Sequence, residues 1–339
     1  MKLIENQSLK NLNTFGVDVK AKYFAEVESE IELFELLNSS YFKENKYLIL
    51  GAGSNVLFLN DYDGLIIKIT DTILNVIDET PTEVIIECKA GAIWDDVVKF
   101  SVDNNFYGIE NLSLIPGTIG AAPIQNIGAY GAELSNVLLD VQGISTSSLN
   151  QQELQVSDCK LSYRNSIFKN ELRNSFIITS VKLRLSKTPK VNINYRDLKE
   201  KFNFRSFDNI SLQEIRDAVI NIRKNKLPDT QNLGNAGSFF KNPTINKNHL
   251  LKLNDKNKDL VFFKLDEDTF KIPAGWLIEK CGFKGKRIGN VGSYEKQALI
   301  IVNFGNASGR EIQNFSDQII SLVDKQFGII LEPEVNFIS

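Results

Sequence analysis

The stretch "ILGAGSNVLF" (49–58) decides how this chain can fold, because a strand runs into a glycine turn and a second strand follows. Backbone N–H groups at such a turn can hold a pyrophosphate, so a phosphate loop and a plain tight turn are both compatible with the pattern. The standard dinucleotide-binding fingerprint needs a third glycine and an opening helix. Val56 stands at the third-glycine position, and "VLFLND" predicts a strand. The standard fingerprint is therefore absent.

A second glycine-rich stretch, "LSLIPGTIGAAPIQNIGAYGAEL" (112–134), combines Gly, Ala and Pro with few bulky side chains. Its side chains are too small for a core and too apolar for a solvated loop. Such a surface lets the backbone approach a flat ligand closely. A buried crossover packed on a sheet is the alternative interpretation, and the residues alone leave both open.

The remaining periodicities predict alternating strands and helices, which indicates an α/β or α+β fold. Strands are expected at 46–50, 64–69, 83–91, 176–186 and 297–305, and helices at 31–38 and 94–104. Ser211 and Glu214 form a capping-box signature for a helix that stops at Pro228. The spacing of Ile312, Phe315 and Ile319 predicts a last helix that ends at Gly328.

Composition bounds the function. The chain has 339 residues, of which 42% are hydrophobic, so disorder is not expected. Its net charge of −3 argues against nucleic acid and anionic membranes as partners. No apolar run approaches the roughly 18–20 residues of a membrane span, and the N-terminus has no apolar signal region, so a cytoplasmic protein without membrane insertion is expected.

Histidine and cysteine usage excludes further classes of site. A single imidazole, His249, cannot form a multi-His metal centre, and its polar surroundings predict a surface or capping role. Cys88, Cys159 and Cys281 are odd in number and far apart, which predicts buried or idle thiols rather than a disulfide scaffold. No metal site is expected. Proton transfer then falls to Ser, Tyr, Lys or carboxylates, or to a cofactor.

Eight motifs carry a resemblance to a known family. They are "NTFGV" (13–17), "ILGAGSN" (49–55), "IPGTIGAAPIQNIGAYG" (115–131), "YRNSIFK" (163–169), "KLPD" (226–229), "GNAGSFFKNP" (234–243), "AGWLIEKCGFKG" (274–285) and "LEPEV" (331–335). In order and spacing the chain resembles the UDP-N-acetylenolpyruvoylglucosamine reductases, the MurB flavoenzymes of peptidoglycan synthesis, over nearly its whole length. "VNINYRDL" (191–198) resembles the long-loop form of this family.

The resemblance implies an α+β protein with an FAD-binding fold of the vanillyl-alcohol oxidase type. Two α/β lobes at 1–70 and 71–205 would hold FAD, and a C-terminal α+β domain at 206–339 would bind substrate. The last strand, near 331–338, is expected to return to the flavin site. The implied reaction reduces UDP-N-acetylglucosamine enolpyruvate to UDP-N-acetylmuramate for cell wall biogenesis, with NADPH as reductant and a hydride passing from flavin N5 to the terminal enolpyruvyl carbon. A monomer is expected.

The resemblance also implies three catalytic residues. Ser238 would donate a proton to the carbon next to the hydride-accepting carbon, whereas without the resemblance it reads as a turn or capping residue. Arg164 would hold the substrate carboxylate with its planar fork of donors; by itself it reads as a surface arginine. Leu331, Pro333, Val335 and Phe337 alternate as one face of a strand, which leaves Glu332 and Glu334 equivalent. The family pattern selects Glu334, as an acid or donor near the same carbon.

The remaining implied contacts are with FAD and with the UDP-sugar. FAD contacts are expected from Gly51, Gly53, Ser54, Asn55, Pro116, Gly117, Ala121, Ala122, Gln125, Ile127, Gly128 and Arg223. Substrate contacts are expected from Tyr130, Tyr195, Lys226, Asn242 and Gln297. Ala121 and Ala122 lack the hydroxyl that some relatives carry there, so only their backbone can contact the flavin. Tyr294 stands where many relatives have histidine, and its role is undefined.

Two rival functions remain compatible with parts of the sequence. A nucleotide-sugar-binding protein that kept the fold and lost turnover would bind substrate without reducing it; Ser238, Arg164 and Glu334 argue against it. A two-domain NAD(P) dehydrogenase without flavin is disfavoured by the missing third glycine and would be colourless. The visible spectrum of the purified protein separates these classes.

Overall fold

The computed structural model describes residues 1–203 and 209–339. The chain divides into two compact units. The first comprises Met1–Gln7, Ala21–Ala52 and Asp63–Asn225, and the second comprises Ser8–Lys20, Gly53–Tyr62 and Lys226–Ser339. The boundary expected between 205 and 206 lies outside the described residues, and the division into two lobes and a substrate domain stays a prediction.

One sheet of the first unit is formed by the N-terminal strands. Its order is β1 (Lys2–Ser8), β2 (Lys20–Val27), β5 (Tyr62–Ile69) and β3 (Tyr47–Ile49), and β3 pairs with β5 in parallel. Helices α1 (Glu30–Asn38) and α2 (Ser40–Lys43) follow β2. The Ser29 side chain accepts a hydrogen bond from the Glu32 N–H and so caps α1. Leu33, Leu36 and Leu37 of α1 are buried against this sheet's residues Ala25, Leu65 and Ile67.

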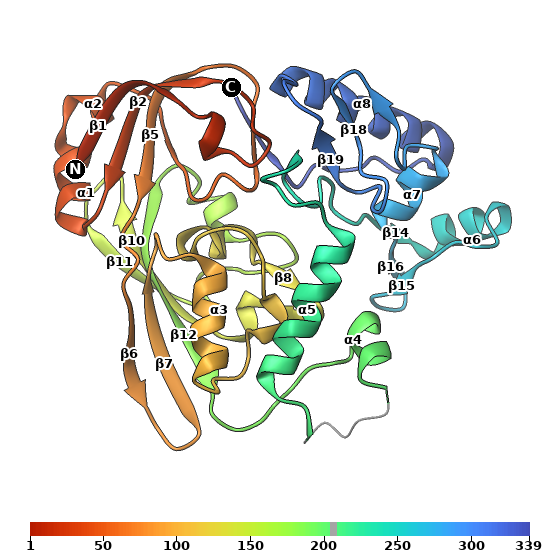
Figure 1. Ribbon diagram of the computed structural model, residues 1–339, viewed down its shortest axis with the longest axis horizontal. Coiled ribbons are helices and arrows are strands. Elements are labelled where there is room, and N and C mark those ends of the chain that lie inside the picture. The colour runs from red at the N-terminus through yellow and green to blue at the C-terminus, as the bar shows by residue number, and fades with distance from the viewer. Residues whose placement is uncertain (204–208) are drawn as a thin grey trace. The chain divides into compact units, whose positions relative to one another are not determined.

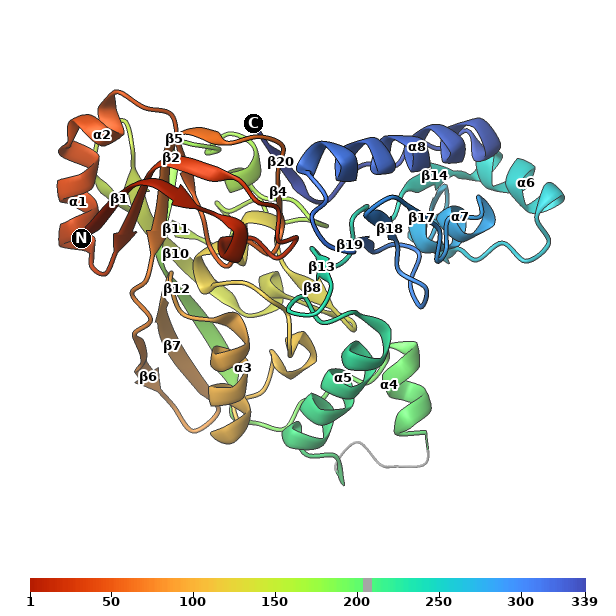
Figure 2. The same ribbon diagram turned by 45° about the horizontal axis from the view of Figure 1, so that its top comes forward.

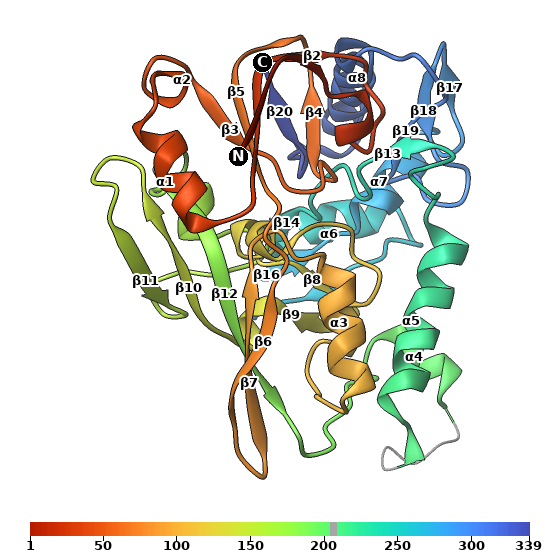
Figure 3. The ribbon, with the colours of Figure 1, turned by 60° about the vertical axis from the view of Figure 1, so that its left-hand side comes forward.

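The larger sheet of the first unit has five antiparallel strands. Their order is β11 (Gln151–Gln155), β10 (Leu138–Ser145), β12 (Phe176–Ser186), β7 (Glu83–Lys89) and β6 (Leu74–Glu79). Figure 3 shows β6 and β7 as a long pair beside helix α3 (Trp94–Asp103). Trp94, Val97, Val98 and Val102 of α3 pack with the inner face of this sheet in one hydrophobic core.

The glycine-rich segment runs across this core as short turns rather than as regular structure. Three 3-10 turns (Glu110–Leu112, Ile119–Ala121 and Pro123–Gln125) precede a small hairpin of β8 (Gly128–Ala129) and β9 (Ala132–Glu133). Ile119, Ala122, Ile127 and Leu134 anchor the segment in the core. Helices α4 (Arg196–Lys201) and α5 (Leu212–Lys226) follow later in the chain, and Figure 1 shows α5 beside α3.

The second unit consists of small sheets and three helices within the described part of the chain. Its four-stranded sheet has the order β13 (Gly234–Asn235), β19 (Ile301–Asn303), β18 (Val291–Ser293) and β17 (Arg287–Ile288). A three-stranded sheet has the order β14 (Thr244–Asn246), β16 (Thr269–Lys271) and β15 (Phe263–Lys264), and β20 (Asn336–Ile338) pairs in parallel with β4 (Val56–Phe58). Helices α6 (Lys247–Lys256), α7 (Ala274–Lys280) and α8 (Gly309–Phe327) complete the unit, and α8 is the long helix of Figure 2.

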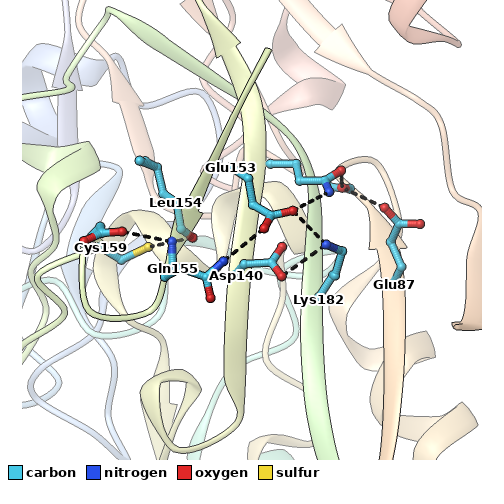
Figure 4. Close-up of polar contacts among 10 residues, drawn as sticks. Glu87, Asp140, Glu153, Leu154, Gln155, Cys159 and Lys182 are labelled. Carbon is cyan, nitrogen blue, oxygen red and sulfur yellow. Dashed lines mark hydrogen bonds and ion pairs between the residues drawn. The ribbon is translucent and has the colours of Figure 1, made fainter. Parts of the chain in front are cut away.

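A polar network covers the outer face of the five-stranded sheet (Figure 4). The Lys182 ammonium is 3.1 Å from Asp140 Oδ2 and 2.9 Å from Glu153 Oε2. Ser180 donates to Glu87 or Gln142 on the neighbouring strands β7 and β10. We refer to Lys182, Asp140 and Glu153 as the Lys182 network. Because side chains alternate along β12, this network faces away from Val181 and Leu183, which lie in the core.

Most elements expected from periodicity are present. The expected strand at 176–186 and the helix starting at Trp94 are confirmed, and the strand at 46–50 is confirmed as Tyr47–Ile49. Ser211 and Glu214 form the expected reciprocal cap, since each backbone N–H is bonded to the other's side chain. Gly328 ends α8 in the left-handed conformation, as expected.

Two predicted strands are wrong in extent. Only Ile301–Asn303 of the expected strand 297–305 is extended and paired, because 297–300 form a turn in which the Ile300 N–H bonds to the Gln297 carbonyl. The alternating strand expected through Leu331, Pro333 and Val335 is also wrong. Its residues form one isolated bridge, Phe240 with Pro333, and the regular strand starts only at Asn336.

Candidate functional site

The two glycine-rich stretches meet in the first unit. A Cβ on Gly51 would lie 2.8 Å from Thr118 Oγ1 and 3.4 Å from Ala121 Cβ, so the first loop needs glycine to pack against the second. Gly120 needs glycine for the same reason, because its Cβ would lie 2.7 Å from Ala90 Cβ. The 118–122 backbone is also fixed to the strand end at 90–92, since Ile119 N–H bonds to Ala92 O and Gly120 N–H bonds to Ala90 O.

A pocket opens in the first unit between these loops and the two sheets. Its lining carries no charged side chain, and Thr118 contributes the hydroxyl group nearest to Gly51. The lining residues are 49–51, Ile69, Ala90, Thr118, Gly120, Ala121, Ile124 and 176–178. Gly51 and Ala121, both expected to contact FAD, line this pocket. A flat uncharged group fits such walls, whereas a multiply charged one would be left without partners.

The other residues of the glycine-rich segment that were expected at FAD follow in sequence. Gly117 has a φ of +140°, and its carbonyl accepts the N–H of Trp94 at the start of α3. Ala122 and Ile127 are buried and joined by a bond from the Ile127 N–H to the Ala122 carbonyl. Pro116 directly precedes Gly117, and Gln125 ends the 3-10 turn between Ala122 and Ile127.

The first glycine loop continues into the second unit. Gly53 has a φ of +65°, and a Cβ there would lie 2.0 Å from the Leu12 carbonyl oxygen, so no other residue fits. Thr14 N–H bonds to the Gly53 carbonyl at 3.0 Å, which explains why "NTFG" accompanies the loop in the sequence. Ser54 and Asn55 come next. The Asn55 carbonyl accepts the Asn336 N–H at 3.0 Å, and Asn55 Nδ2 donates to the Glu334 carbonyl at 3.3 Å.

Ser238 is exposed on a firmly held backbone. Phe239 and Phe240 directly after it are each 1% exposed, and their rings are in contact with each other. Gly237 before it has a φ of +66°, and its N–H is bonded to Asn235 Oδ1. Phe239 N–H bonds to the Leu299 carbonyl at 2.9 Å. The Phe pair therefore anchors the turn while the hydroxyl of Ser238 points away from the core.

The structure separates the two glutamates that the sequence left equivalent. Glu334 is buried, with 8% exposure, and its N–H bonds to the Phe239 carbonyl at 2.8 Å. Glu332 is exposed and forms an ion pair with Lys241. The bridge between Phe240 and Pro333 brings Glu334 to the residue adjacent to Ser238. Glu334 is thus the glutamate held close to the predicted proton donor.

Arg164 lies in the first unit against the β8–β9 hairpin. Its Nη2 donates to the Gly128 carbonyl at 2.9 Å, and its guanidinium lies over the Tyr163 ring. Its backbone has a φ of +54°, an unfavourable region for a side chain of this size. Such strain costs on the order of 1–2 kcal/mol, so packing and hydrogen bonds must hold the residue there. Gly128, expected at FAD, is thus in contact with this arginine.

Tyr130, Tyr195 and Arg223 form one group in the first unit. The rings of Tyr130 and Tyr195 are edge to face with centroids 5.1 Å apart. Arg223 interacts electrostatically with Tyr130. Burial raises the pKa of Tyr130, although the positive charge of Arg223 opposes the shift. Two predicted substrate residues and a predicted FAD residue therefore contact one another.

The predicted substrate residues of the second unit lie in two places, at the end of α5 and at the start of α7. Lys226 is exposed at the end of α5, as expected. Asn242 and Gln297 meet at the first turn of α7: Asn242 Oδ1 accepts the Ala274 N–H at 2.9 Å, and a Cβ on Gly275 would lie 2.9 Å from Gln297 Oε1. Tyr294 precedes the turn that carries Gln297, and its N–H bonds to the Ile300 carbonyl.

The histidine contacts a helix end, and the three cysteines are free thiols. His249 Nε2 is 2.8 Å from the carbonyl of Phe327, the last residue of α8, which agrees with the expected surface or capping role. Burial raises the pKa of the Cys88 and Cys159 thiols to about 12 and of Cys281 to about 11, so all three stay protonated at neutral pH. All three are free, as expected.

Sequence reasoning missed a buried ion pair next to the Arg223 group. Asp95, in the first turn of α3, binds Arg216 of α5 through both carboxylate oxygens. A signal was present: Arg216 follows Leu212 by four residues and precedes Val219 by three, so it lies on the apolar face of α5. Such a position predicts a paired charge, but the sequence does not name the partner.

Comparisons with known proteins identify the family. The chain is 44% identical to the UDP-N-acetylenolpyruvoylglucosamine reductase of Flavobacterium johnsoniae over 100% of both chains. It is 40% identical to that of Bacteroides fragilis and 38% identical to that of Bdellovibrio bacteriovorus, each over 98% of this chain and 99% of the relative. The chain belongs to the UDP-N-acetylenolpyruvoylglucosamine reductase family. The resemblance carried by the sequence motifs is confirmed.

Family models match both units. Residues 21–145 match the FAD binding domain, and residues 228–338 match the UDP-N-acetylenolpyruvoylglucosamine reductase C-terminal domain. In fold the chain is similar to the crystal structure of the enzyme from Thermus caldophilus, with a TM-score of 0.68, 21% identity and coverage of 100% and 98% of the two chains. The predicted α+β class with an FAD-binding fold is confirmed. The chain is therefore a flavin-dependent oxidoreductase.

Two further properties concern the described part of the chain. No helix within it is both long enough and apolar enough to cross a membrane. Nor do three or more His, Cys, Asp or Glu side chains gather in residues 1–203 and 209–339 in an arrangement that could hold a metal ion.

Proposed function

We propose that this protein reduces the enolpyruvyl ether of UDP-N-acetylglucosamine enolpyruvate to the lactyl ether of UDP-N-acetylmuramate, with NADPH as reductant and FAD as cofactor. The product is the sugar nucleotide from which peptidoglycan is built, which places the reaction in cell wall biogenesis and in the cytoplasm. Family membership over the full length of the chain supports this assignment. The finer assignments of residues to roles rest on the geometry of each unit.

The residues expected to hold FAD fit a flat nucleotide cofactor. Gly51 and Gly53 lie where a Cβ would meet Thr118 or the Leu12 carbonyl, so the first glycine loop can keep this conformation only with glycine at both positions. The pocket beside Gly51 and Ala121 has uncharged walls, which suits a planar ring system. Ala121 and Ala122 offer only backbone groups. FAD, once reduced by NADPH, supplies the hydride that the reaction requires.

The chain's own residues must then manage charge and protons. Addition of a hydride to the terminal carbon of the enolpyruvyl group leaves negative charge on the adjacent carbon, delocalised into the carboxylate. A guanidinium that binds the carboxylate stabilises this charge, and Arg164 is held for that role by its bond to the Gly128 carbonyl. Lys226, Tyr130, Tyr195, Asn242 and Gln297 bind the UDP-sugar portion.

Ser238 donates the proton to the charged carbon. A serine hydroxyl is a weak acid, but the acceptor is a strongly basic carbon, so a hydroxyl held at contact distance suffices. The observation that carries this proposal is the contrast at 238–240: an exposed hydroxyl is followed by two fully buried aromatic anchors. Glu334, joined through its N–H to the Phe239 carbonyl, is the second acid or donor beside the same carbon.

Ser238→Ala tests the assignment in two separate half-reactions of the holoenzyme. NADPH should bleach the yellow protein at the wild-type rate, because no enolpyruvyl carbon is protonated in that step. Reoxidation by the enolpyruvyl substrate should slow by roughly 10²–10⁴-fold, the usual contribution of a positioned general acid. Ser148→Ala, an exposed serine in the loop after β10, is the matched control and should change neither rate.

Three outcomes contradict different parts of the proposal. A colourless purified protein, or flavin that stays reduced after the enolpyruvyl substrate is added to wild type, contradicts the function itself. An unchanged reoxidation rate in Ser238→Ala contradicts only the role of Ser238.

We also propose that the protein is a monomer and that it belongs to the long-loop form of the family. Light scattering of the holoenzyme tests the oligomeric state, and deletion of 191–195 tests the role of the long loop.

A further inference from the structure

A nearly buried ion pair joins α3 to α5, the helix that carries Arg223. Arg216 Nη1 is 2.7 Å from Asp95 Oδ1, and Arg216 Nη2 is 2.9 Å from Asp95 Oδ2. The side chains are 9% and 24% exposed, respectively. A bidentate pair of this kind fixes the rotation of α5 against α3 as well as the distance between them, because two parallel hydrogen bonds have a defined plane.

The same carboxylate also fixes the start of the glycine-rich segment. Asp95 Oδ1 accepts the backbone N–H of Leu114 at 2.5 Å. Leu114 has a φ of +59°, which is unfavourable for a leucine and must be held by its surroundings. It lies two residues before Pro116, where the predicted FAD contacts of this segment begin. One side chain therefore connects α3, α5 and the glycine-rich segment.

Arg223 lies seven residues after Arg216 and so two turns along the same face of α5. Burial lowers the pKa of Arg223, while Tyr130 and the negative charge of Asp95 both favour its charged form. Its guanidinium interacts electrostatically with Tyr130, and the Tyr130 ring packs against Tyr195. The positions of Tyr130 and Tyr195, the two predicted substrate tyrosines, thus depend on the orientation of α5 through Arg223.

We propose that Asp95 and Arg216 are a positioning pair: by fixing α5 they hold Arg223 against Tyr130 in the arrangement that binds the UDP-sugar. Neither residue touches substrate in this proposal, and neither takes part in proton transfer. The inference rests on the proposed function, because it assumes that Tyr130 and Tyr195 contact the UDP-sugar. It adds two residues and a mechanism of action that the sequence motifs did not contain.

Substrate binding to the oxidised holoenzyme, measured by calorimetry without NADPH, tests the pair apart from turnover. Asp95→Asn keeps the shape of the side chain and removes the charge, and we expect the Kd for UDP-N-acetylglucosamine enolpyruvate to rise at least tenfold. Arg216→Met should have a similar effect. Arg216→Lys keeps the charge but loses the two-pronged geometry, so its Kd should lie between those of Arg216→Met and wild type.

A double-mutant cycle separates positioning from general destabilisation. If Asp95 acts through Arg223, the effect of Asp95→Asn on Kd should fall below twofold in an Arg223→Met background, because the group being positioned is gone. A merely structural role would instead give the same tenfold loss in both backgrounds. Lys182→Met serves as the control for a broken ion pair in the same unit, and its Kd should equal that of wild type.

The possible failures are distinguishable. If wild-type holoenzyme does not bind the UDP-sugar, the proposed function is wrong. If wild type binds and Asp95→Asn binds equally well, or the two effects add in the cycle, the positioning pair is wrong and the function stands. Should Asp95→Asn fail to retain FAD, Arg216→Lys carries the test alone: a Kd equal to that of wild type then contradicts the inference.

Discussion

The first unit contains two clusters of charged side chains that are chemically alike and lie on opposite sides of its largest sheet. In one, Arg216 binds Asp95 beside Tyr130 and Arg223. In the other, Lys182 binds Asp140 and Glu153 on the outer face of β10, β11 and β12. Arg216 is paired with one carboxylate and Lys182 with two, and each cluster connects several elements.

The two clusters differ in what lies next to them. Asp95 is bonded to the glycine-rich segment, whose Ile119 and Ala122 enter the core with Val181 and Leu183 of β12. Lys182 and Ser180 point to the other face of the same strand, where their partners are strand side chains. Burial and ion pairing alone therefore do not identify a functional site, since both clusters have them. What distinguishes Asp95 is its hydrogen bond to the segment that is predicted to bind FAD.

Lys182→Met should give the largest change in stability. Removing the cation leaves Asp140, only 3% exposed, as a buried and unpaired charge. Breaking a buried pair in this way costs about 3 kcal/mol in the free energy of unfolding. Urea unfolding of the holoenzyme measures the loss, and turnover below the transition should match wild type. If turnover of Lys182→Met falls under conditions where the variant is fully folded, then the Lys182 network also affects function, and the two clusters do not differ as proposed.

Arg223→Met should show the opposite profile. The loss of the positive charge beside Tyr130 is expected to weaken binding of the UDP-sugar roughly thirtyfold, equivalent to about 2 kcal/mol. The free energy of unfolding should change less than in Lys182→Met, because no buried anion loses a bidentate partner. Calorimetric titration and urea unfolding on the same preparation compare the two quantities. If Arg223→Met unfolds at a lower urea concentration than wild type but binds the UDP-sugar with the wild-type Kd, then Arg223 stabilises the fold, as the Lys182 network does.

The double variant Lys182→Met with Asp140→Asn should recover most of the stability lost by Lys182→Met. The second change removes the charge that the first left unpaired, and neutral replacements of both partners are often nearly neutral in energy. Urea unfolding of the two single variants and the double variant gives the coupling. Additive losses would show that Lys182 stabilises the sheet by packing rather than by its charge.

The smallest expected effect is on the pH dependence of stability, where the clusters should differ in sign. Burial acts to raise the pKa of Asp95, but Arg216 and the Leu114 N–H together hold it below its usual value. Burial raises the pKa of Asp140 in spite of Lys182, since its Oδ1 is buried without a hydrogen bond. Asp95 therefore stabilises the fold above about pH 4 and stops doing so as the pH falls through its lowered pKa.

Asp140 has the reverse dependence, because its ionisation costs the native state free energy above its raised pKa. The difference in unfolding free energy between wild type and Asp95→Asn should shrink on acidification below pH 4. The difference between wild type and Asp140→Asn should instead move in favour of wild type at higher pH, as the pH falls from above the raised pKa of Asp140 towards about pH 4. Thermal unfolding at several pH values compares the variants with wild type. Curves that shift in the same direction would contradict the assigned pKa directions.

Local patterns predicted the regular elements well where local physics decides them. The capping box at Ser211 and the glycine end of α8 follow from backbone groups that must be satisfied at helix ends, so a few residues suffice. The prediction of a strand at 331–335 is wrong because this segment forms an isolated bridge with 240–241 and no continuous β-ladder. Alternation in the sequence could not show which partner was available.

By itself the sequence determined the family, the α+β class, the two glycine loops and the identity of the candidate groups, because motifs and glycine requirements are properties of short stretches. Only the tertiary structure decided that Glu334 rather than Glu332 is buried beside Phe239, and that Asp95 meets Arg216 across 121 residues. Burial and ion pairing depend on which distant segments are brought together. No local pattern contains that information.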